Sequence, residues 1–205
     1  TRRLLEAMEA QVHAGLALQI VLGPSGSGKS SLVRAGLFPA LAAAVRAQGL
    51  VLLSRTISDL AELGDQPLAT ALASSLLDLD GPQGAVFPAA SAQSLGQRLH
   101  TGASGVLQEL HDMLASLAQA GRQLRFGLFI DHFETVFAAR RSQAERQAFL
   151  CLLEQLARSH AMLVVIGCRN DFYPAIAQHA LLMEGKPHGG HFDLAPPGSA
   201  DLAQM

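Results

Sequence analysis

Apolar residues are gathered in short runs, and the stretches between these runs have helical spacing. The runs have the length of strands, and in most of them nearly every position is apolar. Such runs are typical of strands that are buried on both faces of a parallel sheet. We predict strands over residues 16–22, 50–57, 126–131, 161–168 and 191–194.

The intervening stretches place apolar residues three and four positions apart, as helices with one buried face do. Leu4, Met8 and Val12 show this spacing in residues 1–14, which we expect to form a helix before the first strand. Strands that alternate with helices are typical of an α/β domain with helices on both faces of the sheet. Further helices are expected over residues 29–47, 66–79, 91–120, 142–160 and 171–183, and residues 195–205 are expected to begin another.

Proline and glycine mark where these helices are expected to begin or break. Pro39 should kink or divide the helix over residues 29–47, because proline lacks the amide hydrogen that a helix interior uses. Gly102 and Gly105 should divide residues 91–120 into two helices. Asp65, followed by Pro67, is expected to cap the helix over residues 66–79.

Composition and charge narrow the class of protein. The chain of 205 residues is 49% hydrophobic and 16% charged, with a formal net charge of −2. These values exclude a disordered chain and disfavour a nucleic-acid-binding domain, which needs a basic surface. We expect no membrane segment, because no apolar run approaches the roughly 18 residues that one needs. Cys151 and Cys168 are expected to be buried thiols of a cytoplasmic protein.

A glycine-rich loop after the first predicted strand fits the Walker A pattern. Its glycines let backbone N–H groups surround phosphate, and the next helix directs its positive end there. Lys29 is expected to reach the β- and γ-phosphates, and Ser30 to bind Mg²⁺. The alternative is a strand-to-helix turn with an incidental lysine. The residues expected to contact nucleotide are Gly23, Pro24, Ser25, Gly26, Ser27, Gly28, Lys29, Ser30 and Ser31.

Acidic residues follow the third predicted strand. Asp131 ends that strand and is expected to hold Mg²⁺, in part through water, as a carboxylate at this edge does. Glu134 is expected to orient or deprotonate the attacking water. The alternatives are that Asp131 caps the next helical turn and that Glu134 is a surface residue.

Arg169 follows the fourth predicted strand and is a candidate sensor of the γ-phosphate. In that role it would report hydrolysis to the rest of the chain. The alternative is an arginine that pairs with Asp171 at the start of the next helix.

Four segments together resemble the bacterial novel STAND NTPases, which are signal-transduction ATPases with numerous domains. They cover nearly the whole chain from about residue 16 and occur in the family's order. His132 stands where the family usually has glutamine, and Thr135 where it often has a second glutamate. The segments are residues 23–41 around Walker A, residues 130–134 as Walker B, residues 168–173, and residues 192–197 with 201–202.

The resemblance implies a three-layer P-loop NTPase fold of the AAA-like (ASCE) type, with strand order 5-1-4-3-2. It implies that residues 1–205 are the core of a longer protein with sensor and effector domains. It also implies a switch that binds ATP or ADP with Mg²⁺, hydrolyses ATP slowly and forms a nucleotide-dependent homo-oligomer. Two alternatives stay open: a P-loop kinase of nucleotides or small molecules, and a module whose assembly is gated by nucleotide without hydrolysis.

Overall fold

Five parallel strands form the central sheet of the structure, a computed structural model that describes residues 2–42, 49–61, 63–82, 84–117 and 122–195. Every neighbouring pair of strands in this sheet is parallel. Across the sheet the order is β2 (Gly49–Asp59), β5 (Arg122–Asp131), β6 (Met162–Arg169), β1 (Leu18–Gly23) and β7 (His191–Asp193).

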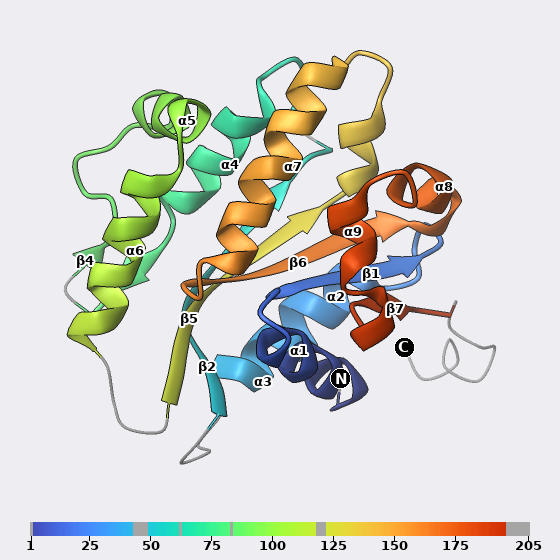
Figure 1. Cartoon of the computed structure of the whole chain (residues 1–205), viewed down its shortest axis with the longest axis horizontal. Helices are drawn as coiled ribbons and strands as arrows, with labels where there is room; N and C mark the ends of the chain where they lie inside the picture. The colour runs from blue at the N-terminus through green and yellow to red at the C-terminus, as the bar shows by residue number, and fades with distance from the viewer. Residues whose placement is uncertain (1, 43–48, 62, 83, 118–121, 196–205) are drawn as a thin grey trace.

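The first strand of the chain lies inside the sheet, between the fourth and fifth strands. Counted in chain order within this sheet, the strands from the β7 edge are the fifth, first, fourth, third and second. The labels run higher because β3 (Asp80–Gly81) and β4 (Gly84–Ala85) form a separate antiparallel hairpin. The ends of β1, β5 and β6 therefore meet at one edge, towards which their arrows point in Figure 1.

Helices cover both faces of the sheet, which confirms the predicted three-layer α/β fold (Figure 1). One face carries α1 (Arg2–His13), α2 (Lys29–Ser31), η1 (Leu32–Leu37) and α3 (Phe38–Ala42). The other face carries α4 (Leu68–Leu76), α5 (Ala92–Thr101), α6 (Ser104–Ser116) and α7 (Gln143–Arg158). Shorter elements follow β5 and β6: η2 (Phe133–Phe137), η3 (Asn170–Phe172), α8 (Tyr173–Ile176), α9 (Ala180–Glu184) and η4 (Lys186–His188).

The core has two layers because successive strand residues point to opposite faces. In β6, Val164 and Ile166 pack with α4 to α7, whereas Leu163 and Val165 pack against the layer of α1 and α3. All four side chains are fully buried. The near-continuous apolar runs of the sequence are thus explained by burial on both faces.

The helix after the glycine-rich loop differs from a regular α-helix. It is helical from Lys29 to Ala42, but η1 within it is a π-helix, in which the Phe38 amide donates to the Val33 carbonyl. The disruption expected at Pro39 therefore takes the form of one wide turn directly before it. Residues 43–48 of the predicted helix lie outside the described residues, as do residues 196–205 of the expected C-terminal segment.

Three other expectations were wrong in detail. Asp65 does not cap α4; the Leu68 amide instead donates to Oε1 of Glu145 at 3.0 Å, a partner distant in sequence. The helix predicted over residues 171–183 is interrupted before α9, where His179 has extended backbone and stacks on Phe137. Cys151 is exposed rather than buried, whereas Cys168 is buried as predicted.

Among the described residues, no helix is both long enough and apolar enough to cross a membrane.

Candidate functional site

The glycine-rich loop connects the end of β1 to the start of α2. Gly26 and Gly28 have φ values of 75° and 85°, a conformation that glycine adopts without strain. Gly23 is required for another reason, since a Cβ there would lie 2.6 Å from Ser27 Oγ and 2.8 Å from the Leu194 carbonyl oxygen. Glycine is thus favoured at positions 26 and 28 by the backbone conformation and at position 23 by close packing.

Lys29 lies folded over this loop. Its Nζ donates hydrogen bonds to the carbonyl oxygens of Gly23 at 3.0 Å and Pro24 at 2.9 Å. These bonds hold the ammonium group beside the loop, where phosphate oxygens would replace the carbonyls as its partners. Lys29 is therefore placed for the predicted role, but it has to exchange partners to fulfil it.

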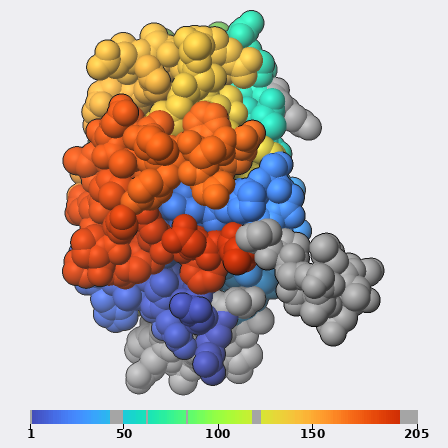
Figure 2. Space-filling model, turned by 90° about the vertical axis from the view of Figure 1, so that its right-hand side faces the viewer, coloured from blue at the N-terminus to red at the C-terminus, as the bar shows by residue number. Residues whose placement is uncertain are grey.

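A cavity of about 280 Å³ lies between this loop and the ends of β5 and β6. In Figure 2 the blue segment of the loop and its helix is exposed beside the orange segment that follows β6. The cavity brings together all four predicted catalytic residues and much of the predicted phosphate-binding loop. Its lining consists of Ser25, Gly26, Gly28, Lys29, Ser30, Ser31, Asp131, His132, Glu134 and Arg169.

Asp131 ends β5 and is almost fully buried, with 3% of its surface exposed. Its Oδ1 accepts the His132 amide at 3.1 Å, and its Oδ2 lies 3.4 Å from Nη2 of Arg34. The Ser30 hydroxyl and the Asp131 carboxylate are oxygen donors of the kind that Mg²⁺ prefers. The donor set therefore fits Mg²⁺, with a buried carboxylate whose charge a cation would balance.

Two charged residues of this site were not predicted. Asp59 ends β2 in register with Asp131, and Nη2 of Arg34 reaches both carboxylates, at 3.9 Å and 3.4 Å. Ligand atoms of Asp59, Asp131 and His132 lie within 4.8 Å of one another. The signal for Asp59 was a carboxylate just beyond a predicted strand, whose end was placed two residues too early. Arg34 gave no signal, because the π-helical turn that positions it was not expected.

The Glu134 carboxylate contacts the end of β6. Its Oε2 accepts the Arg169 amide at 3.2 Å. Burial, and then the charge and hydrogen bond of Glu134, raise the pKa of the Cys168 thiol to about 12. The Glu134 carboxylate thus lines the cavity but is already engaged in holding the end of β6.

Arg169 forms the alternative pairing that the sequence left open. Its Nε and Nη2 donate to the two carboxylate oxygens of Asp171 at 3.0 Å and 2.6 Å. These hydrogen bonds lower the pKa of Asp171. Arg169 lines the cavity, yet in this state its guanidinium is bound to Asp171.

The two cysteines are expected to differ sharply in reactivity. At pH 8 an aromatic disulfide reagent should modify Cys151 rapidly and Cys168 only after unfolding, because the thiolate is the reactive form. A pKa of about 12 leaves Cys168 protonated at that pH, and its thiolate forms only as the pH rises towards this value. Release of the chromophore counts the thiols. A Cys151→Ser variant with a fast-reacting thiol would contradict the expectation.

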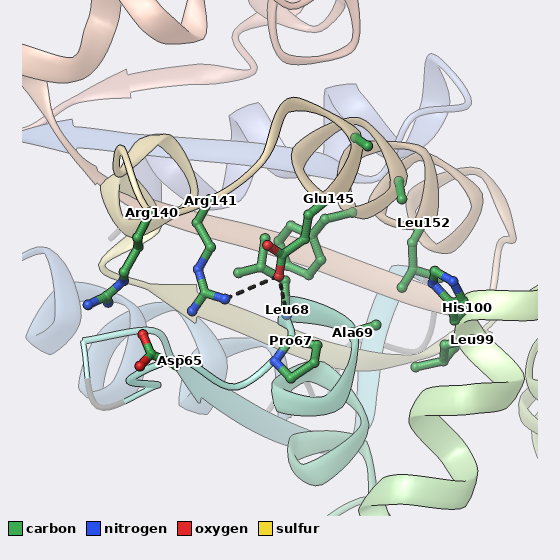
Figure 3. Close-up of a pocket in the computed structure, with 13 residues that line it drawn as sticks. Asp65, Pro67, Leu68, Ala69, Leu99, His100, Arg140, Arg141, Glu145 and Leu152 are labelled. Atoms are coloured by element: carbon green, nitrogen blue, oxygen red, sulfur yellow. Dashed lines mark hydrogen bonds and ion pairs between the residues drawn. The ribbon is translucent and has the colours of Figure 1, made fainter.

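A second cavity, of about 620 Å³, lies between α4, α5 and α7 (Figure 3). It shares no lining residue with the first. At its polar end Nη1 of Arg141 donates to Glu145 at 3.1 Å and to the Gln66 carbonyl at 2.7 Å, while Nη2 donates to the Gly64 carbonyl at 2.9 Å. Arg141 therefore fixes the segment that continues β2 beyond Asp59.

Replacing Arg141 by methionine should lower the free energy of unfolding by about 3 kcal/mol. The change removes a buried arginine, its ion pair with the part-buried Glu145, and its hydrogen bonds to the carbonyls of Gln66 and Gly64. Arg140→Met is the matched control, because Arg140 is exposed, and a surface change alters stability by about 0.5 kcal/mol or less. Urea unfolding of the three chains measures both values. Equal losses in the two variants would refute the clamping role of Arg141.

Known proteins that are similar to this chain are NTPases. The profile of the family described as Novel STAND NTPase 1 matches residues 1–205. Among solved structures, a Walker-type ATPase of Pyrococcus abyssi is similar, with a TM-score of 0.55 and 16% identity; the match covers 97% of this chain and 55% of that one. This likeness concerns the fold alone, and the chain spans about half the length of that ATPase. Among curated proteins, no match was found.

Proposed function

Because this chain belongs to the novel STAND NTPase 1 family, we propose that it binds ATP with Mg²⁺ and hydrolyses it slowly as a switch. One observation carries the proposal: Lys29, Ser30 and Asp131 line the same cavity at the carboxyl edge of a parallel sheet. Ligands bind at this edge in open α/β folds. The loop supplies backbone and ammonium groups for phosphate, and Mg²⁺ supplies charge neutralisation between the phosphate oxygens when bound.

Slow turnover is supported by the state of the charged groups. Lys29 is bonded to loop carbonyls, and Arg169 is paired with Asp171. Both side chains have to exchange partners before they can contact a γ-phosphate. We propose that Arg169 acts as the sensor when it leaves Asp171, so that its position depends on whether ATP or ADP is bound.

The wider consequences of the switch are part of the same proposal. The nucleotide state of this domain would control homo-oligomerisation and pass a signal to sensor and effector domains of a longer cytoplasmic protein. A kinase acting on nucleotides or small molecules is the second candidate, supported by the phosphate loop. A nucleotide-gated module without hydrolysis is the third, supported by the engaged state of Glu134.

Thermal unfolding with ATP, ADP, GTP or no nucleotide, each with Mg²⁺, tests the proposal while phosphate release is followed. A ligand at 100 times its Kd adds about 2.7 kcal/mol of stability, which is a clear rise in Tm. A rise with ATP and slow phosphate release supports the switch, and a rise without release favours the gated module. Phosphate transfer to a nucleoside monophosphate would favour the kinase. No rise with any nucleotide would contradict all three.

A further inference from the structure

His132 contributes an imidazole ring to the phosphate-loop cavity directly after Asp131. The side chain is 46% exposed, and its Nδ1 lies 2.8 Å from Oδ1 of Asp59. An ionised carboxylate can only accept a hydrogen bond, so the hydrogen of this contact lies on Nδ1. The Nε2 of the neutral ring is then an acceptor.

Asp59 is itself held in place by several groups. Its Oδ1 also accepts the Ala61 amide at 3.0 Å, and its Oδ2 lies 3.9 Å from Nη2 of Arg34. The parallel pairing of β2 with β5 sets Asp59 opposite Asp131. The carboxylate that fixes the His132 tautomer is thus positioned by the sheet and by two neighbours.

The backbone of His132 is also unusual. Its φ of 52° and ψ of 44° are in the left-handed region, where non-glycine residues are uncommon. Two hydrogen bonds support it: the His132 amide donates to Asp131 Oδ1 at 3.1 Å, and its carbonyl accepts the Thr135 amide at 3.0 Å. Strained residues of this kind persist where the surroundings hold them and are concentrated at functional sites.

Glu134, which was predicted to orient or deprotonate the attacking water, already has another hydrogen-bond partner. The Oε2 of Glu134 accepts the Arg169 amide at 3.2 Å. The acceptor capacity of this carboxylate is therefore partly used by β6. His132 lines the same cavity, and with hydrogen on Nδ1 its Nε2 is an acceptor that a water molecule can use.

We propose that Nε2 of His132 accepts a hydrogen bond from the water that attacks the γ-phosphate, and that Asp59 is a positioning residue that fixes the ring tautomer. The inference rests on the proposed function. The water oxygen forms a bond to the γ-phosphorus, the bond to the β–γ bridging oxygen breaks, and its electron pair leaves with ADP. A proton of the water ends on the released phosphate, so His132 is unchanged by turnover.

The tautomer is measured without nucleotide. Long-range ¹H–¹⁵N spectra of the imidazole rings, recorded at about pH 9 where histidines are generally neutral, should show His132 with hydrogen on Nδ1. In Asp59→Ala this tautomer should lose its excess, because its acceptor is gone. His132→Ala identifies the signal by its absence. A wild-type ring with hydrogen on Nε2 overturns the proposal.

Kinetics provides the second measurement. His132→Ala should lower kcat for ATP hydrolysis on the order of 100-fold, with the ATP concentration at half-maximal rate little changed. Asp59→Ala should lower kcat at least about tenfold, as loss of an orienting partner does. His188→Ala is the matched control, since His188 is an exposed histidine outside the cavity, and it should hydrolyse ATP like the wild type.

The ATP-induced rise in Tm separates this inference from the proposed function. If the wild type shows the rise and hydrolysis, but His132→Ala retains the wild-type kcat, the inference is wrong and the proposed function stands. Hydrolysis that survives in His132→Ala and is lost in Glu134→Gln would assign the water to Glu134. If the wild type shows no rise with ATP, the proposed function itself fails.

Discussion

Replacement of Lys29 by alanine should abolish the rise in Tm that ATP with Mg²⁺ gives the wild-type chain. The ammonium group is placed over the loop by two carbonyl oxygens and is the cation available there to exchange them for phosphate oxygens. Charge-assisted hydrogen bonds to phosphate are among the strongest that a side chain makes. We expect the Kd for ATP to rise at least about 100-fold, which removes about 2.3 kcal/mol or more of the roughly 2.7 kcal/mol of ligand-induced stability at a concentration that is 100 times the wild-type Kd.

The chain contains a matched control for this experiment. Lys186 is the only other lysine, is exposed, and donates to the Tyr173 hydroxyl at 2.5 Å far from the loop in sequence. Lys186→Ala should keep the full rise in Tm with ATP. Each variant is compared with its own nucleotide-free sample, because the lost carbonyl contacts alter stability slightly. A Lys29→Ala chain that responds to ATP like the wild type would falsify the site assignment.

Phe129→Ala should lower the free energy of unfolding by about 4 kcal/mol, within the range for large aromatic truncations in cores. The Phe129 ring is fully buried on β5 and packs with Leu163 and Val165. It also occupies the space beside Gly167, where a Cβ would lie 3.1 Å from the ring. Since folded domains are stable by only about 5–15 kcal/mol, this loss is a large share of the total.

Urea unfolding measures this effect, provided that the dependence of the free energy of unfolding on urea concentration is the same in the variant and the wild type. Phe129→Leu is the control, because it keeps an apolar side chain at the same place, and it should lose less than half as much. A loss below about 1 kcal/mol in Phe129→Ala would mean that the layer between the sheet and α1 is not packed as described. The two Phe129 variants are also expected to lower the Tm of the nucleotide-free chain in the same order.

The parts of the molecule that the sequence predicted well depend on neighbours in the chain. The phosphate loop needs glycines and a lysine at fixed spacing between a strand and a helix, all of which are visible in residues 16–42. The strands were found because burial on both faces leaves nearly continuous apolar runs. The family assignment and the three-layer fold followed from the order of these segments, and both were confirmed.

The parts that the sequence did not predict depend on contacts between distant segments. Asp59 joins the site through the register of β2 with β5, which no local pattern encodes. The cap of α4 comes from Glu145, which lies 77 positions away. For Arg169 the sequence allowed two partners, and the structure has the pairing with Asp171. Whether Arg169 also senses phosphate stays a prediction.

The π-helical turn of η1 bears on how many residues related chains have between the Walker A lysine and the proline that follows η1. A regular α-helix advances about 100° per residue, so a helix with one π-helical turn holds one residue more than its length requires. The extra residue lets Ser30 line the cavity while Leu37 and Phe38 are buried in the core. A related chain that is one residue shorter between its Walker A lysine and this proline should have a straight α-helix there, and should lack the arginine contact to the two carboxylates.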